Sequence, residues 1–170
     1  PEIAKVVENF DVEVPFIRPK ELATDSATTF SVLKHVVGYY DSIGESFDAV
    51  FLQEPSSPFT RPEEIDIAVE CMIKNDASLV VSLKKLHNAL PFIGPLEENG
   101  NISSIITQLR NYTTANRQSL PAAYSLNGIV YLIKCDLIRN YPTFYCDMEN
   151  SYGFISDPDL SIEIDSEIDL

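Results

Sequence analysis

The sequence predicts an α/β protein with a mostly parallel sheet that is covered by helices on both faces. Three observations lead to this prediction. Strand-like apolar runs alternate along the chain with segments whose apolar residues recur at helical spacing. Two of the runs, "DAVFLQ" and "SLVVSLK", are apolar almost throughout, which is typical of strands buried on both faces. The chain has 170 residues, of which 45% are hydrophobic, so residues 1–170 suit one domain with a sizeable core.

The first part of the chain predicts two helices separated by an extended segment. Residues 3–10 carry apolar side chains at helical spacing, which indicates the end of an amphipathic helix. "DVEV" predicts a short strand, and Pro15 and Pro19 predict an extended loop after it. Residues 24–40 begin with N-capping side chains and continue with helical periodicity, so we expect a helix there.

The rest of the chain continues the alternation with one interruption. Pro62 suits the first turn of a helix over 62–75, which also begins with acidic residues. Residues 85–123 contain the turn signal "ENGN" and long polar segments, and predict an excursion that serves as a dimerisation arm. The remaining strands and the last short helix are expected at 48–53, 78–84, 128–134 and 135–141.

Composition narrows the possible partners and the compartment. Twelve basic and 26 acidic residues give a formal charge of −14, which argues against a nucleic-acid surface. An anionic substrate would need a metal ion and local basic residues to overcome this field. No apolar run approaches the roughly 18 residues of a membrane span, and the first ten residues do not resemble a secretion signal. Three cysteines without metal-binding spacing indicate reduced thiols, so we expect a cytoplasmic protein with no membrane partner.

The segment "SIEIDSEIDL" places two carboxylates on one face of an expected strand. Glu163 and Asp165 would lie about 6.6 Å apart along the strand, a spacing that suits a hard cation such as Mg²⁺. The alternative is an exposed edge strand with a solvated acidic face, and the spacing alone favours that alternative. "SEID" matches a capping box and predicts a helix that starts at Ser166.

Two more stretches carry polar residues next to expected strands. "EPSSPFTRP" is a loop stiffened by prolines, which would preorganise Glu54, Ser56 and Ser57 for a ligand, or is an ordinary connection. Asn127 could hydrogen-bond a polar ligand, and Gly128 could allow a close backbone approach. The alternative is a turn that starts a strand, and these two residues alone favour that alternative.

The basic residues of this acidic chain are also candidates. Arg18 stands in the proline-rich loop and could hold a phosphate or a base, and Thr24 and Asp25 lead into a helix whose N–H groups could bind an anion. A simple helix cap is the alternative. Arg110 and Arg117 lie in the excursion. The sequence contains no Walker loop, G-x-G-x-x-G or G-x-S-x-G motif.

Four of these stretches together resemble the acylneuraminate cytidylyltransferase family, the CMP-sialic acid synthetases. "PFIRPKELATDSATT", "LQEPSSPFTRPEEID", "RQSLPAAYSLNGIVYLI" and "SIEIDSEIDL" match the family's motifs in its order and at roughly its spacing. The resemblance implies a three-layer, Rossmann-like nucleotide-diphospho-sugar transferase fold and a homodimer with an exchanged arm. It also implies transfer of CMP from CTP to a nonulosonic acid, with release of pyrophosphate and with Mg²⁺ or Mn²⁺ as cofactor.

The resemblance also implies roles for particular residues. It places Glu163 and Asp165 on the metal, and Arg117 on the sugar carboxylate of the partner subunit's site. Asp165 and Arg117 would be the catalytic residues. The residues implied to contact the nucleotide are Arg18, Ala27 and Thr29. The residues implied to line the sugar pocket are Glu54, Arg117, Asn127 and Tyr131.

The chain also departs from the family pattern. Glu54 stands where the family has Gln, Glu163 where it has Asp, and Thr60 where it has Arg. The family's first strand and its phosphate-gripping loop have no counterpart, so we expect a fragment of a longer enzyme, truncated at both ends and inactive by itself. Two alternatives remain: an enzyme that activates another acid sugar such as KDO, and an inactive sugar- or nucleotide-binding domain.

Overall fold

The chain forms two compact units. The computed structural model describes residues 2–113, 116, 119–164 and 166–169. The first unit comprises Pro1–Asp48 and Cys135–Cys146, and the second comprises Ala49–Lys134 and Asp147–Leu170. The assignment of residues 1–170 to one domain stays a prediction.

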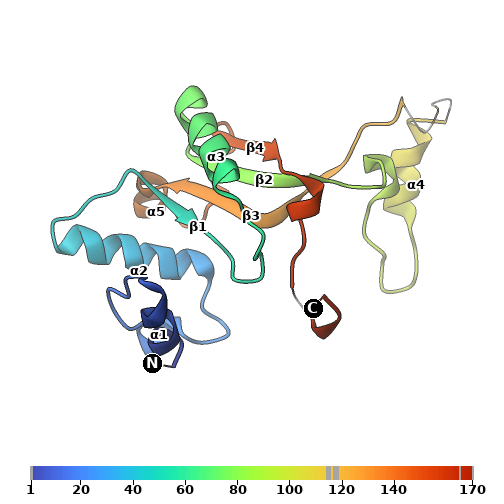
Figure 1. The fold of residues 1–170 in the computed structure, drawn as a ribbon. Coiled ribbons are helices and arrows are strands. Elements are labelled where there is room, and N and C mark those ends of the chain that lie inside the picture. Colours follow the sequence, from blue (N-terminus) through green and yellow to red (C-terminus); the bar gives the residue numbers. More distant parts are fainter. Residues whose placement is uncertain (1, 114–115, 117–118, 165, 170) are drawn as a thin grey trace. The chain divides into compact units, whose positions relative to one another are not determined.

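A four-stranded sheet forms the second unit (Figure 1). Its strands stand in the order β1-β3-β2-β4, and β3 runs antiparallel to both of its neighbours, whereas β2 and β4 are parallel. The expectation of a mostly parallel sheet is therefore wrong for the described strands. The strands are β1 (Ala49–Leu52), β2 (Leu79–Lys85), β3 (Tyr124–Lys134) and β4 (Ser151–Ile155).

The direction of β3 follows from where the excursion returns. Lys85 at the end of β2 pairs with Tyr124 at the start of β3, and the Leu86 N–H donates to the Ala123 carbonyl at 2.8 Å. The chain thus re-enters the sheet at the end it left, so β3 must run back along β2. A parallel neighbour would need a crossover to the opposite end of the sheet.

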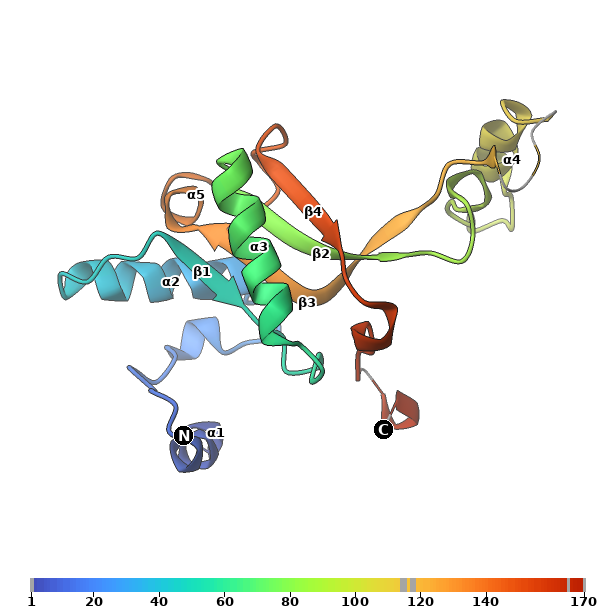
Figure 2. The same ribbon diagram turned by 45° about the horizontal axis from the view of Figure 1, so that its top comes forward.

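The excursion itself is confirmed as a segment that leaves the sheet between β2 and β3 (Figure 2). It contains the short helix η3 (Leu90–Phe92) and the helix α4 (Ser103–Arg110). The Gln108 amide donates to the Ile93 carbonyl at 3.1 Å, and Gly94 allows the two helical parts to approach closely. The use of this segment as a dimerisation arm stays a prediction.

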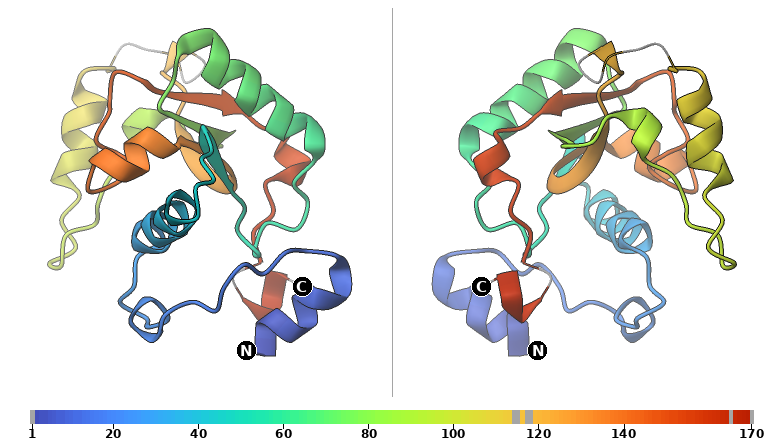
Figure 3. Two further views of the ribbon diagram at one scale, coloured as in Figure 1. Left: turned by 90° about the vertical axis from the view of Figure 1, so that its left-hand side faces the viewer. Right: turned by 90° about the vertical axis from the view of Figure 1, so that its right-hand side faces the viewer.

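Helix α3 (Pro62–Asn75) covers one face of the sheet (Figure 3). Pro62 occupies its first turn, as the sequence predicts, since its missing N–H would have no partner there. Ala68 and Met72 of this helix pack against the sheet. The hydrophobic core between helix and sheet comprises Ala68, Met72, Ala77, Val80, Ile129, Val130, Leu132 and Leu160.

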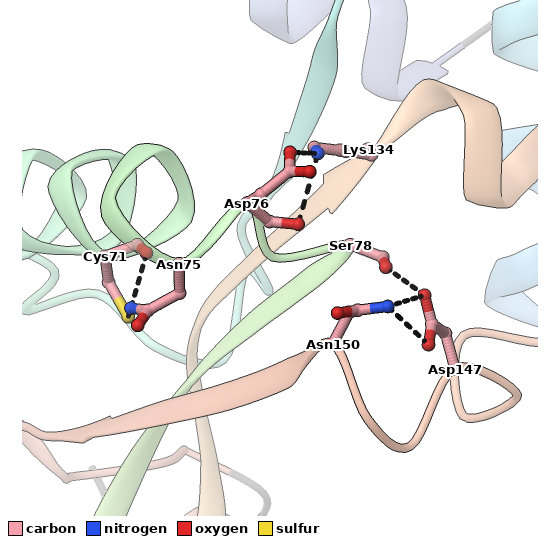
Figure 4. Close-up of polar contacts among 7 residues, drawn as sticks. All are labelled: Cys71, Asn75, Asp76, Ser78, Lys134, Asp147 and Asn150. Carbon is pink, nitrogen blue, oxygen red and sulfur yellow. Dashed lines mark hydrogen bonds and ion pairs between the residues drawn. The ribbon is translucent and has the colours of Figure 1, made fainter.

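Polar contacts hold the chain where it passes from α3 into the sheet (Figure 4). Asp76 ends the helix in a left-handed conformation (φ 50°), and Lys134 forms an ion pair with it. The Ser78 hydroxyl donates to Asp147, and the Asn150 amide donates to both oxygens of the same carboxylate at 3.0 and 3.1 Å. These hydrogen bonds, that of Ser78 first, lower the pKa of Asp147. They also fix the start of β4 beside β2.

Two expected strands are not formed. Residues 11–14 contain a turn and an extended stretch without strand pairing, and residues 161–164 have no regular secondary structure. Alternating polar and apolar side chains predicted strands there, but strands need partners for their backbone groups. Strand β1 is confirmed but is only half-buried, because it stands at the edge of the described sheet. The helix expected at Ser166 is a short one, η6 (Glu167–Asp169), and it follows η5 (Pro158–Leu160).

The first unit consists of helices. Thr28 caps α2 by accepting from the Ser31 N–H at 3.1 Å, and Arg139 of α5 donates to both carboxylate oxygens of Asp41 at 2.8 and 2.9 Å. The Arg139 hydrogen bond lowers the pKa of Asp41. The helices are α1 (Glu2–Val7), η1 (Glu8–Phe10), η2 (Lys20–Leu22), α2 (Thr29–Ser42) and α5 (Cys135–Asn140). Among the described residues, no helix combines the length and apolar character needed to cross a membrane.

The core of the second unit yields a test of stability. Ile129 is fully buried under α3, whereas Ile73 of α3 is 77% exposed. Ile129→Ala should lower the free energy of unfolding by about 2–5 kcal/mol, because it leaves a cavity. Ile73→Ala removes the same atoms from the surface and should change stability little. Urea unfolding of both variants checks the difference, and equal effects would contradict this description of the core.

Candidate functional site

Two loops meet at the end of the sheet where β1, β2 and β4 finish and β3 begins. The loop of residues 53–61 follows β1, and residues 156–164 follow β4. The Ile164 N–H donates to the Ser56 carbonyl at 2.8 Å, so the two loops lie side by side (Figure 3). Both loops follow the carboxyl ends of strands, where ligands commonly bind in open α/β sheets.

A bulge in β3 shapes the sheet at this end. Between the pairs Val81–Tyr131 and Leu83–Leu126, Ser82 alone faces residues 127–130. The Ser82 hydroxyl oxygen accepts from the Val130 N–H at 2.9 Å and so replaces a missing backbone partner. The extra residues of β3 turn through a left-handed conformation, which a glycine adopts without strain.

That glycine is Gly128, with φ 68°, and it lies under the Glu163 carboxylate. A Cβ atom on Gly128 would lie 3.2 Å from Glu163 Oε1 and 3.5 Å from Ser57 Oγ. Both oxygens therefore approach the backbone through the space that a side chain would fill. The close approach predicted for Gly128 is real, and what approaches is the chain's own carboxylate.

The oxygens around Gly128 suit a hard cation. Ser57 is 1% exposed, and its hydroxyl has no hydrogen-bond partner within the described structure. Glu163 is half-buried beside it. Within residues 2–113, 116, 119–164 and 166–169, no three acidic, histidine or cysteine side chains gather into a metal cluster. Mg²⁺ commonly needs only one or two carboxylates besides water and substrate phosphates, so these residues fit such an ion.

Asn127, next to this glycine, is buried in a network of side-chain hydrogen bonds. Its side chain is fully buried and is surrounded by three serine hydroxyls. The Ser82 O–H donates to its carbonyl oxygen at 2.5 Å, and its amide donates to Ser156 at 2.6 Å and to Ser161 at 3.0 Å. A direct contact between this amide and a sugar would require the network to open.

The other predicted site residues lie on different elements of the two units. Glu54 is half-buried just after β1, and Tyr131 is half-buried within β3, paired with Leu52 and Val81. In the first unit, Arg18 lines a groove of about 620 Å³ together with apolar side chains of α1 and α2. Ala27 and Thr29 flank Thr28 at the start of α2. The remaining two, Arg117 and Asp165, lie outside the described residues.

Comparison with known proteins decides the family. No protein-family model matches the chain. It is 28% identical to the CMP-N,N'-diacetyllegionaminic acid synthase of Legionella pneumophila over 99% of this chain and 70% of that protein. It is 30% identical to the post-translational flagellin modification protein B of Campylobacter coli, over 99% and 69%. The N-acylneuraminate cytidylyltransferase of Escherichia coli is 27% identical, over 90% of this chain and 34% of that protein. The chain belongs to the acylneuraminate cytidylyltransferase family.

Within this family member, sequence reasoning missed a buried acid next to the candidate site. Glu64, in the first turn of α3, is 5% exposed, and one of its carboxylate oxygens has no partner within the described structure. The Asp157 backbone N–H donates to the carboxylate, but burial has the larger effect and raises the pKa of Glu64. Arg61 lies 3.8 Å from the Asp157 carboxylate. The sequence shows only an acid in a first turn, where acids are common.

Gly128 gives a test of the site's geometry. Gly128→Ala should lower the free energy of unfolding by about 1–2 kcal/mol through its positive φ alone. The total loss in free energy of unfolding should be larger, because the new Cβ displaces the Glu163 carboxylate. Gly100→Ala is the matched control, since Gly100 also has a positive φ (80°) but nothing within 4 Å of the added atom. Urea unfolding measures both, and equal losses would show that Glu163 is not held against Gly128.

Glu64 gives a test based on pH. Because its pKa is raised in the folded state, the stability that its proton contributes is complete below the unfolded-state pKa. That stability is lost as the pH rises through the folded-state pKa. Glu64→Gln stays neutral, so its Tm should exceed that of the wild type at about pH 8, with the difference shrinking toward about pH 4. Glu63→Gln, at the exposed neighbouring position, should show no such trend in thermal unfolding.

Proposed function

We propose that this chain is the catalytic part of a cytidylyltransferase that activates a nonulosonic acid of the sialic or legionaminic type. The observation that carries the proposal is the alignment of 99% of the chain with a CMP-N,N'-diacetyllegionaminic acid synthase. CTP and the acid give the CMP-sugar and pyrophosphate. The proposal includes a nucleotide-diphospho-sugar transferase fold, a cytoplasmic location, and a homodimer in which residues 85–123 form the exchanged arm.

The reaction requires control of negative charge. The anomeric hydroxyl of the acid loses its proton to solvent and attacks the α-phosphorus of CTP. A new P–O bond forms, and the bond from the α-phosphorus to the oxygen that bridges to the β-phosphate breaks to release pyrophosphate. A bound Mg²⁺ would supply charge neutralisation at the phosphates. Glu163, with Asp165 two residues further on, would hold that ion. The Ser57 hydroxyl, which has no hydrogen-bond partner among the described residues, is a further oxygen at the same place.

The substrates would use the remaining predicted residues. Arg18, in the groove of the first unit, would contact the nucleotide, and so would Ala27 and Thr29 at the start of α2. Glu54 and Tyr131 would face the sugar, and Arg117 would bind its carboxylate through a charge-assisted, two-pronged contact. A net charge of −14 makes these few cations important, because the background field repels both substrates.

Glu54 also favours a second candidate, an inactive binding domain. An acid that follows β1 would repel an acidic sugar, whereas the family pattern has a neutral Gln there. An inactive domain, however, has no need for a cation-binding carboxylate. The Glu163 carboxylate packs closely against Gly128, as expected for a residue with a defined position. Activity distinguishes the two candidates directly.

The test is pyrophosphate release by the complete gene product. CTP and Mg²⁺ are supplied with a panel of sialic, legionaminic and pseudaminic acids and KDO. We expect release with a nonulosonic acid, abolition by EDTA, and a loss of about 100-fold or more in Glu163→Gln, because a ligand of the ion is removed. Glu167→Gln changes an exposed acid of the same C-terminal segment and should keep the wild-type rate.

Three results would contradict the proposal in different ways. Release with KDO alone would indicate the related acid-sugar enzyme. No release with any acid, from a folded protein, would support the binding domain. Full activity in Glu163→Gln would remove this residue from the metal site while leaving the reaction in place.

A further inference from the structure

Asn127 connects three parts of the second unit through one buried side chain. Its carbonyl oxygen accepts from Ser82 of β2, and its amide donates to Ser156, just after β4, and to Ser161. Ser82 and Ser156 are 1% and 3% exposed, and Asn127 itself has no exposed surface. The hydrogen bonds of Asn127 to Ser82 and Ser156 are therefore shielded from water, whereas its bond to the half-buried Ser161 lies at the edge of the network.

The donors and acceptors of this network form one consistent chain. The Val130 N–H donates to Ser82, whose O–H donates to Asn127. Both amide hydrogens of Asn127 are then used on serine oxygens, and the Ser161 O–H continues to the Asp157 carbonyl at 3.4 Å. Because Ser82 accepts from Val130 and donates to Asn127, the Asn127 carbonyl oxygen must face Ser82, and its amide faces Ser156 and Ser161. The Asn127 amide thereby holds Ser161 beside β3.

The fixed position of Ser161 determines where Glu163 can lie. Ser161 precedes Glu163 by two residues and is held by Asn127, whereas Ile164 follows Glu163 and is held by the Ser56 carbonyl at 2.8 Å. Glu163 is thus anchored on both sides. The residue after Asn127 is Gly128, against which the Glu163 carboxylate rests. One dipeptide of β3 therefore supplies both the anchor for the segment and the surface for its carboxylate.

We propose that Asn127 is a positioning residue for Glu163, and that it serves the reaction through this carboxylate instead of contacting the sugar. The inference rests on the proposed function for its catalytic meaning. Its structural content, that the Asn127–Ser161 hydrogen bond places Glu163, can be tested without any reaction.

The structural test is amide hydrogen exchange on the complete gene product. Ser161→Ala removes one acceptor of the Asn127 amide, and Asn127→Ala removes the whole network. Ser125→Ala is the control, because its buried hydroxyl on the same strand has no partner within the described structure. We expect exchange of the Ile164 N–H to accelerate about fivefold in Ser161→Ala, as for the loss of one net hydrogen bond, and more in Asn127→Ala. The control should match the wild type.

The catalytic test separates positioning from sugar contact. If Asn127 acts through Glu163, Ser161→Ala and Asn127→Ala should both raise the half-saturating Mg²⁺ concentration, by about tenfold for the larger change, because an indirect support of a metal ligand is lost. The KM for the acid, measured at saturating Mg²⁺, should stay within about twofold of the wild type. A sugar contact would give the reverse: a raised KM for the acid in Asn127→Ala, and no change in Ser161→Ala.

Each outcome has a defined meaning. Unchanged exchange at Ile164 in Ser161→Ala would overturn the positioning role, whatever the activity. Accelerated exchange with a raised KM for the acid would overturn its catalytic meaning. A wild-type protein that releases no pyrophosphate with any acid would end the proposed function, while the exchange result would still decide whether Asn127 places Glu163. Because Asn127→Ala could unfold, Ser161→Ala carries the decision.

Discussion

The hydrogen bond between Ser82 and Asn127 is the interaction on which the site end of the sheet depends. It lies where β3 carries more residues than β2 can pair, and the Ser82 side chain supplies the partners that the bulge takes away. Once the bulge is closed in this way, the left-handed turn at Gly128 follows, and a surface without a Cβ is open to Glu163. The local loss of β pairing thus makes room for a carboxylate at the site.

The elements that the sequence predicts well are those determined by local chemistry. Pro62 starts α3 and Thr28 caps α2 because a missing N–H and a short hydroxyl suit helix beginnings wherever they occur. The direction of β3 is not determined locally. It depends on where the 38 intervening residues, 86–123, return to the sheet, and the sequence of β3 alone does not indicate this. Residues 161–164 alternate like a strand, but their backbone bonds to a loop.

The candidate site was predictable in its parts and not in its arrangement. The "SIEID" segment and the loop after β1 were each candidates from the sequence, and the hydrogen bond from Ile164 to Ser56 places them side by side. The Asn127–Gly128 pair was expected at a ligand, yet Asn127 faces inward while Gly128 receives Glu163. Serine is too common for Ser82, Ser156 and Ser161 to be chosen from sequence. Only the bulge register, a tertiary property, brings the three hydroxyls to one amide.

Electrostatics explains why such an anchored carboxylate would matter in an acidic protein. Arg61, Lys134 and Arg139 form ion pairs with the chain's own acids, as Lys134 does with Asp76 and Arg139 with Asp41. Because these cations are paired, they do little to attract an incoming anion against the net charge of −14. A divalent cation, in contrast, is attracted by the same field. If the proposed reaction holds, its phosphates are stabilised mainly by a cation whose position is fixed by Glu163, and hence by the buried polar network that fixes Glu163.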